Sequence, residues 1–177
     1  MVIIHVAGIS GAGKSFIGEF IKNIYPVSKI KVIDLDDIIQ PAIDNITRKY
    51  KDFEKGKKCL IRTIDSKIDS IIKKYKTVLF VGINAITFNN EDGSQERYET
   101  VKMANKKYYI DVPFNKSSMQ YRDRAAKIIN FTQRGLCIDS IAEYRKSFDI
   151  TKKIYRGKKY KFLSQESIIR DLILFLK

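Results

Sequence analysis

The sequence predicts an α/β fold in which a parallel β-sheet carries helices on both of its faces. Short apolar runs bounded by turn residues alternate along the chain with segments whose apolar residues recur at helical spacing. Alternation of this kind is typical of parallel sheets, because each crossover between strands places a helix on the sheet. The length of 177 residues, with 44% apolar and 31% charged residues, fits a single globular domain spanning 1–177.

The first half of the chain is expected to contain three strands separated by helical segments. Residues 14–24 are expected to form a helix because their apolar side chains share one face, and Pro26 ends it. Helical spacing resumes near Ile38, breaks near Gly56 and returns as an apolar stripe over 61–75. The expected strands are 1–7, 30–37 and 77–83.

The second half begins with a polar segment, 84–100, in which Asn89-Asn90 and Asp92-Gly93 mark turns, so a long surface loop is expected. Ser164 is expected to cap the last helix, whose buried stripe includes Ile168. The remaining expected elements are strands at 107–112 and 159–162, a helix that includes 119–129, and a shorter helix over 138–147.

The chain is strongly basic, with 34 Lys and Arg against 20 Asp and Glu and a net charge of +14. Such an excess fits a nucleic acid or another polyanionic partner, but it also fits a solvated surface in a chain rich in Lys and Ile. No run reaches five basic residues, which favours the solvated surface. Most of the surplus is lysine in scattered pairs, at 57–58, 73–74, 106–107, 152–153 and 158–159.

Cysteine and histidine spacing does not predict a metal site. Cys59 and Cys137 are isolated, and His5 lies inside the first expected strand, where a core or edge position is expected. Reduced thiols fit a cytoplasmic location. No apolar run approaches the roughly 20 residues of a membrane helix, and no basic, apolar leader precedes the first strand. We therefore expect a soluble cytoplasmic protein, and no sequence feature indicates its oligomeric state.

The glycine-rich segment 8–15, Gly-Ile-Ser-Gly-Ala-Gly-Lys-Ser, has the Walker A spacing G-x-x-x-x-G-K-[ST] between a strand and a helix. Glycines let successive backbone amides face one concavity that holds phosphate oxygens, and the helix adds the positive end of its dipole. Lys14 can then reach the β- and γ-phosphates, and the Ser15 hydroxyl can ligate Mg²⁺. The predicted triphosphate-binding residues are Gly8, Ser10, Gly11, Ala12, Gly13, Lys14 and Ser15.

On this motif the chain resembles the small P-loop kinases, the group that includes the nucleoside monophosphate, shikimate, gluconate and adenylylsulfate kinases. Residues 8–15 are very similar to the loop of the gluconate and adenylylsulfate kinases, and a less specific likeness extends over nearly the whole chain. The resemblance implies a three-layer P-loop NTPase fold with a five-stranded parallel sheet of order 2-3-1-4-5. It also implies ATP and Mg²⁺ as cofactors and a mobile lid, which falls at about 115–140.

Three carboxylates, at positions 34, 36 and 37, lie at the carboxyl end of the second expected strand. The carboxyl ends of parallel strands face the ligand crevice, and phosphoryl transfer uses carboxylates to support the metal or orient the acceptor. The Asp34-x-Asp36 pair is similar to that of shikimate kinases, which implies Asp34 near the metal and Asp36 at the acceptor hydroxyl. Asp37 is the alternative for the second role, and helix capping is the structural alternative for Asp36 and Asp37. The third expected strand ends at 82–84 without an acid, which favours the Asp34 and Asp36 cluster for Mg²⁺.

The resemblance also implies that lid arginines neutralise charge during transfer. Arg134 lies where such arginines occur, and Arg122 lies earlier, on the helix leading into the lid; both are candidates, and exposed helix charge is the alternative. Three cations lie where this group binds its acceptor, and segment 157–162 resembles the loop that packs on adenine. The acceptor-site candidates are Arg48, Lys58 and Arg62.

The leading functional prediction is an ATP-dependent phosphotransferase that moves the γ-phosphoryl group to a small acceptor, with a nucleoside or nucleotide as the first choice. Lys14, Asp36, Arg122 and Arg134 are the predicted catalytic residues, and Ser15 and Asp34 the predicted metal ligands. Two alternatives stay open. The basic charge favours a polynucleotide 5′-hydroxyl kinase, and the missing acid after the third strand favours a nucleotide-binding regulator without transfer activity.

Overall fold

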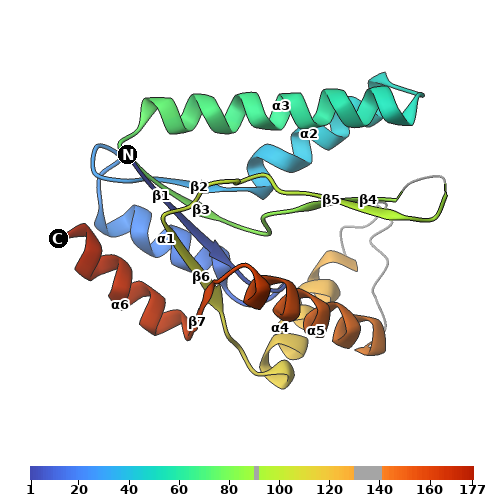
Figure 1. Ribbon diagram of the computed structural model, residues 1–177. Coiled ribbons are helices and arrows are strands. Elements are labelled where there is room, and N and C mark those ends of the chain that lie inside the picture. The colour runs from blue at the N-terminus through green and yellow to red at the C-terminus, as the bar shows by residue number, and fades with distance from the viewer. Residues whose placement is uncertain (90–91, 130–140) are drawn as a thin grey trace.

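A computed structural model of the protein describes residues 1–89, 92–129 and 141–177 (Figure 1). It confirms the predicted α/β fold. The main sheet has five parallel strands in the order β2-β3-β1-β6-β7, which is the predicted order 2-3-1-4-5 when only the strands of this sheet are counted. These strands are β1 (Val2–Ala7), β2 (Lys31–Asp34), β3 (Thr77–Val81), β6 (Lys106–Ile110) and β7 (Lys161–Leu163).

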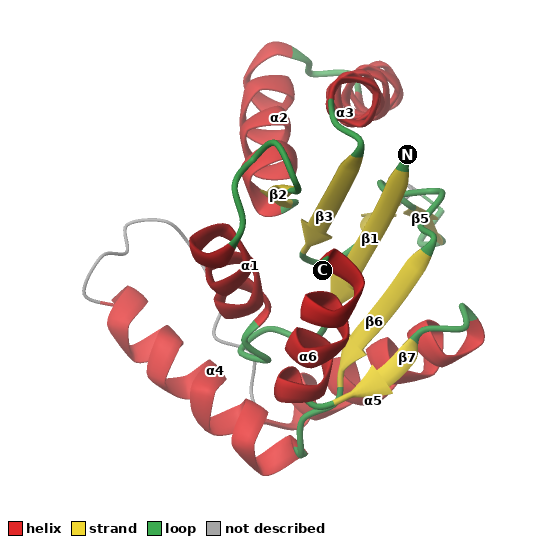
Figure 2. Cartoon of the chain, turned by 90° about the vertical axis from the view of Figure 1, so that its left-hand side faces the viewer, coloured by secondary structure: helices red, strands yellow, loops and turns green. Residues whose placement is uncertain are grey.

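Six helices are described, and they cover both faces of the sheet (Figure 2). On one face, α1 and α6 pack against β1 through a cluster that includes Ile4, Ile17 and Leu172. On the other face, α3 packs against β1 and β3 through Ile3 and Ile64. The helices are α1 (Lys14–Ile24), α2 (Asp36–Lys49), α3 (Phe53–Lys74), α4 (Phe114–Ile129), α5 (Ile141–Gly157) and α6 (Gln165–Leu176).

The crossover from β3 to β6 differs from the prediction. Where a loop was expected, β4 (Ile86–Asn89) and β5 (Gln95–Tyr98) form an antiparallel hairpin whose turn contains Gly93 at φ 78°. Phe88 and Tyr98 pack into the α3 cluster, so the hairpin is held by tertiary contacts. The sequence did not predict the hairpin because its two strands are short and mostly polar, and such segments resemble loops in composition.

The break between α2 and α3 lies at residues 50–52, earlier than the predicted break at Gly56. Asp52 caps α3, its side chain accepting a hydrogen bond from the Lys55 amide at 2.9 Å. Gly56 is buried inside α3, where the helix passes close to Ile46 of α2. Glycine here therefore serves helix–helix packing, not helix termination.

The helix ends and the cysteines can also be compared with the predictions. Ser164 caps α6 as predicted, accepting from the Ser167 amide at 3.2 Å. Helix α5 runs to Gly157, ten residues beyond the predicted end at 147. Cys59 is half-buried, and Cys137 lies outside the described residues. Within the described residues, no helix is long and apolar enough to cross a membrane.

Candidate active site at the carboxyl end of the sheet

The glycine-rich loop connects β1 to α1 at the carboxyl end of the sheet, as predicted. Gly13 precedes the first residue of α1 at φ 86°, in the left-handed region that favours glycine. A Cβ atom at this position would lie 2.6 Å from the Gln165 amide nitrogen. The backbone conformation therefore favours glycine at the point where the first-turn amides of α1 become available to an anion, and a side chain here would also displace the Gln165 amide group.

Two side chains from distant parts of the chain hold the loop. The Tyr144 hydroxyl of α5 donates to the Ser10 carbonyl at 2.9 Å, and the Gln165 amide of α6 donates to the Gly13 carbonyl at 3.0 Å. Within the loop, the Lys14 ammonium donates to the Ile9 carbonyl at 3.0 Å. The loop carbonyls are thus tied to fixed donors. Sequence reasoning missed Tyr144 and Gln165, because nothing local marks a contact made across more than 130 residues.

The two predicted metal ligands lie together. The Ser15 hydroxyl donates to one carboxylate oxygen of Asp34 at 3.1 Å, and the other oxygen accepts from the Asp36 amide at 3.1 Å. Asp36 and Asp37 are exposed in the first turn of α2, where the helix dipole favours acids. No group of three or more His, Cys, Asp or Glu side chains is placed to hold a metal in the described part of the chain. The Ser15–Asp34 pair fits Mg²⁺, which is usually bound by one or two protein oxygens, phosphates and water.

Gly82, just after β3, sets the position of the acidic turn. Its φ of 140° lies in the region that side chains rarely adopt, and a Cβ atom there would approach the Leu35 Cβ to 2.8 Å. Leu35 is fully buried between Asp34 and Asp36, and its amide donates to the Val81 carbonyl at 2.8 Å. The close approach at Gly82 therefore fixes the backbone that carries both carboxylates.

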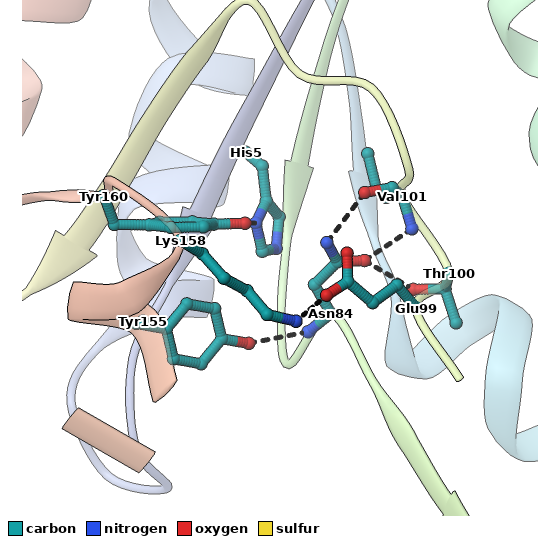
Figure 3. A network of polar contacts seen from close by, with 8 residues as sticks. All are labelled: His5, Asn84, Glu99, Thr100, Val101, Tyr155, Lys158 and Tyr160. Atoms are coloured by element: carbon teal, nitrogen blue, oxygen red, sulfur yellow. Dashed lines mark hydrogen bonds and ion pairs between the residues drawn. The ribbon is translucent and has the colours of Figure 1, made fainter. Parts of the chain in front are cut away.

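A buried polar network lies beside Gly82 on the face of the sheet near α5 (Figure 3). The Asn84 side chain donates to the Val101 carbonyl at 2.8 Å and accepts from the Thr100 hydroxyl at 2.9 Å. The Asn84 backbone amide donates to the Tyr155 hydroxyl at 3.0 Å. Asn84 thus ties the end of β3 to the segment that leads into β6 and to α5. Lys158 and Glu99 form an ion pair at the edge of the network.

His5 is fully buried within the same network, and its tautomer can be assigned. Its Nε2 lies 3.2 Å from the Gly82 carbonyl, which can only accept, so Nε2 carries the proton and Nδ1 accepts from the Tyr160 hydroxyl at 2.6 Å. Burial lowers the pKa of His5 to about 3, and the charges of Lys107 and Lys14 act in the same direction. The core position expected for His5 is confirmed, and the imidazole is neutral at physiological pH.

The predicted lid arginines are only partly described. Arg122 is exposed on α4, directly after Tyr121, whose ring stacks on Tyr144 at 4.4 Å between centroids. Arg134 lies outside the described residues, so its role stays a prediction. The Ser117 to Tyr121 stretch of α4 lies close to Gly11, so α4 packs over the glycine-rich loop.

An apolar cavity of about 350 Å³ lies between the end of α2, the start of α3 and β4. Its walls include Ile46, Tyr50, Phe53, Leu60 and Phe88, with Lys57 beside them. Lys57 lies over the Phe88 ring and pairs with Glu96 at 2.5 Å. The acceptor-site candidates from the sequence do not line it: Arg48 and Lys58 are exposed, and Arg62 lies among acids on the outer side of α3.

In the segment compared with an adenine loop, Tyr160 is buried and packs with Ala7 of β1, Tyr109 of β6 and Tyr155 of α5. Phe162 is partly buried against the same cluster. The Phe162 ring stacks on Tyr109 at 4.6 Å between centroids. These two aromatic side chains therefore belong to the core.

Comparison with known proteins supports the fold. No protein-family model and no curated protein sequence matches the chain. Among solved structures, it is similar to the shikimate kinase from Acinetobacter baumannii in complex with shikimate, with a TM-score of 0.57 and 20% sequence identity. The match covers 97% of this chain and 88% of the other. The chain therefore has the fold of the small P-loop kinases, as the phosphate-loop motif predicted.

Proposed function

We propose that this protein is an ATP-dependent phosphotransferase that moves the γ-phosphoryl group of Mg-ATP to a small acceptor. One observation carries the proposal. The glycine-rich loop and the Asp34 carboxylate, from two different strands, meet through the Ser15 hydroxyl at the carboxyl end of the sheet. A phosphate cradle and a metal-supporting carboxylate in contact are the parts that phosphoryl transfer requires.

Each residue at this end has a distinct role in the proposal. The loop amides and the Lys14 ammonium would bind the β- and γ-phosphates, and Ser15 and Asp34 would hold Mg²⁺, whose charge would stabilise the transferred group. Asp36 orients the acceptor hydroxyl and accepts its proton, because it lies exposed one residue beyond the Leu35 anchor. Arg122 and Arg134 stay candidates for neutralising charge in the transition state.

The acceptor proposed is a nucleoside or nucleotide. The apolar cavity begins at Ile43, seven residues after Asp36 on α2, and a helix rises about 1.5 Å per residue, so the two lie roughly 10 Å apart along the axis. A planar base in the cavity would leave a sugar hydroxyl or phosphate within reach of Asp36. Aromatic and aliphatic walls favour such a flat, apolar group.

A screen for γ-phosphate transfer tests the proposal. Labelled ATP would be offered with nucleosides, nucleoside monophosphates, shikimate, sugar acids and 5′-hydroxyl oligonucleotides. Lys14→Ala should lower the transfer rate by about 10²- to 10³-fold, as loss of a positioned charge in an active site typically does. Lys22→Ala, on the outer side of α1 and paired with Glu19, is the matched control and should leave the rate unchanged.

The outcomes separate the alternatives. Transfer that proceeds equally well in Lys14→Ala contradicts the mechanism. Transfer to oligonucleotides alone supports the polynucleotide kinase. Binding of Mg-ATP without transfer to any acceptor and without ADP formation supports the regulator.

A further inference from the structure

The end of the sheet opposite the glycine-rich loop is lined with lysine. Because the five strands are parallel, the segments that lead into them meet at one edge (Figure 2). Segments 25–31, 75–77, 99–107 and 157–161, which precede or begin β2, β3, β6 and β7, contain nine lysines and a single acid, Glu99. We call these lysines the lysine edge: Lys29, Lys31, Lys76, Lys102, Lys106, Lys107, Lys158, Lys159 and Lys161.

Most charges of the lysine edge have no carboxylate beside them. Lys158 pairs with Glu99, and Lys102 pairs with Asp65 of α3 at 3.0 Å. For the other seven, no Asp or Glu oxygen lies within 4.0 Å in the described part of the chain.

Four of these lysines surround a hollow. A cavity of about 360 Å³ between the amino ends of β6 and β7 is lined by Asn105, Tyr108, Lys106, Lys107, Lys159 and Lys161. The Lys106 ammonium lies over the Phe175 ring at 4.5 Å and the Lys107 ammonium over the Tyr160 ring at 5.8 Å. Lys106 and Lys107 are consecutive in β6, so their side chains leave opposite faces of the sheet, and each ammonium lies over an aromatic ring.

We infer that the lysine edge binds the phosphate backbone of a nucleic acid strand, a function that goes beyond the proposed phosphotransfer and does not depend on it. Neighbouring strands are about 4.8 Å apart, so the edge from β2 to β7 extends roughly 19 Å, enough for several successive phosphates. Lysines are point charges that bind phosphate without demanding one geometry, which suits a polymer of repeating phosphates. A strand can enter the hollow between β6 and β7, whereas a flat bilayer surface cannot.

Binding of a labelled oligo-dT strand, measured by fluorescence anisotropy without ATP, tests the inference. The variant removes the four lysines of the hollow: Lys106→Gln, Lys107→Gln, Lys159→Gln and Lys161→Gln. If two to four of them contact phosphates, affinity near 150 mM salt should fall by about 10- to 200-fold and the slope of log K against log salt by about 1 to 3. The control variant removes the same charge elsewhere: Lys22→Gln, Lys67→Gln, Lys146→Gln and Lys153→Gln, all exposed on α1, α3 and α5.

Circular dichroism and melting temperatures would establish that both variants fold. The control should lose less than about 3-fold in affinity, the effect of net charge alone at a distance. Equal losses in both variants would show that the charge acts diffusely and would overturn the inference. Binding to phosphatidylserine vesicles or inorganic polyphosphate, with none to oligo-dT, would also overturn it. Because ATP is absent, these results do not depend on whether the protein transfers phosphate.

Discussion

The two ends of the parallel sheet present opposite chemistry. At the carboxyl end, Asp34, Asp36 and Asp37 lie beside a glycine-rich loop whose carbonyls are tied by Tyr144 and Gln165. At the amino end, exposed and half-buried lysines surround a hollow with almost no acid near them. The first end suits one phosphate group in one orientation, because backbone amides have fixed directions. The second suits any array of phosphates, because lysine side chains do not.

Helix direction accounts for part of this polarity. Helices α1, α2, α4 and α6 begin at the carboxyl end, so their positive dipole ends favour the acids there. Helices α1, α3 and α5 end at the amino end, where negative dipole ends favour lysine. Dipoles act within the last helical turn, however, and Lys106, Lys107 and Lys161 belong to strands. The hollow therefore has more positive charge than helix stabilisation explains.

The largest expected effect distinguishes Asp36 from Asp37 at the carboxyl end of the sheet. Asp36→Asn should lower the transfer rate by about 10²- to 10⁴-fold, as loss of a general base typically does, while ATP still binds. Asp37→Asn is the matched control and should retain most activity. If Asp37→Asn is the impaired variant instead, Asp37 has the role assigned to Asp36. Single-turnover kinetics with saturating ATP would measure both.

Glycine at the two ends should behave differently. Gly82→Ala should destabilise the protein by about 1 to 3 kcal/mol, because it combines an unfavourable φ with a close approach to Leu35. Gly157→Ala, at the end of α5, meets no atom of the described structure within 4 Å and should be neutral or stabilise by up to about 1 kcal/mol. Urea unfolding would measure both, and equal effects would contradict the role given to Gly82.

His5, between the two ends, should make stability depend on pH. Its pKa falls from 6.5 when unfolded to about 3 when folded, so the unfolded chain takes up the proton first as pH falls below 6.5. Below pH 6.5 the free energy of unfolding therefore falls by about 1.4 kcal/mol per pH unit, or by about 2 kcal/mol between pH 6.5 and 5. His5→Asn should be less stable than the wild type at pH 7, but its free energy of unfolding should no longer fall with pH through this group. An unchanged slope in urea unfolding curves would contradict the assignment.

The smallest expected effect concerns the support of the loop. Tyr144→Phe removes one hydrogen bond to Ser10, worth about 1 kcal/mol, and should weaken ATP binding by about 5-fold. Tyr25→Phe removes a hydroxyl that donates to the Ile173 carbonyl at 3.4 Å, away from the loop, and should leave ATP affinity unchanged. Isothermal titration would compare them, and equal affinities in the two variants would show that Tyr144 does not position the loop.

Local sequence predicted those features whose causes are local. The motif at 8–15, the strand–helix alternation and the Ser164 cap depend on residues within a few positions of one another, and all three are found where expected. The β4–β5 hairpin escaped prediction because packing against α3 stabilises it. The break near Gly56 was misplaced because a buried glycine inside a helix has the same local signature as a glycine that ends one.

The sequence by itself determined that this chain forms a glycine-rich loop with Walker A spacing between a strand and a helix, since the spacing of the glycines and the flanking apolar patterns suffice for that. Only the tertiary structure decided what surrounds the loop: Tyr144 and Gln165 on its carbonyls, Gly82 against the acidic turn, and His5 neutral in a buried network. Lysine pairs that are scattered in sequence likewise meet only because a parallel sheet brings the starts of all its strands to one edge. Spacing along the chain specifies local conformation, whereas packing specifies which distant residues share an environment.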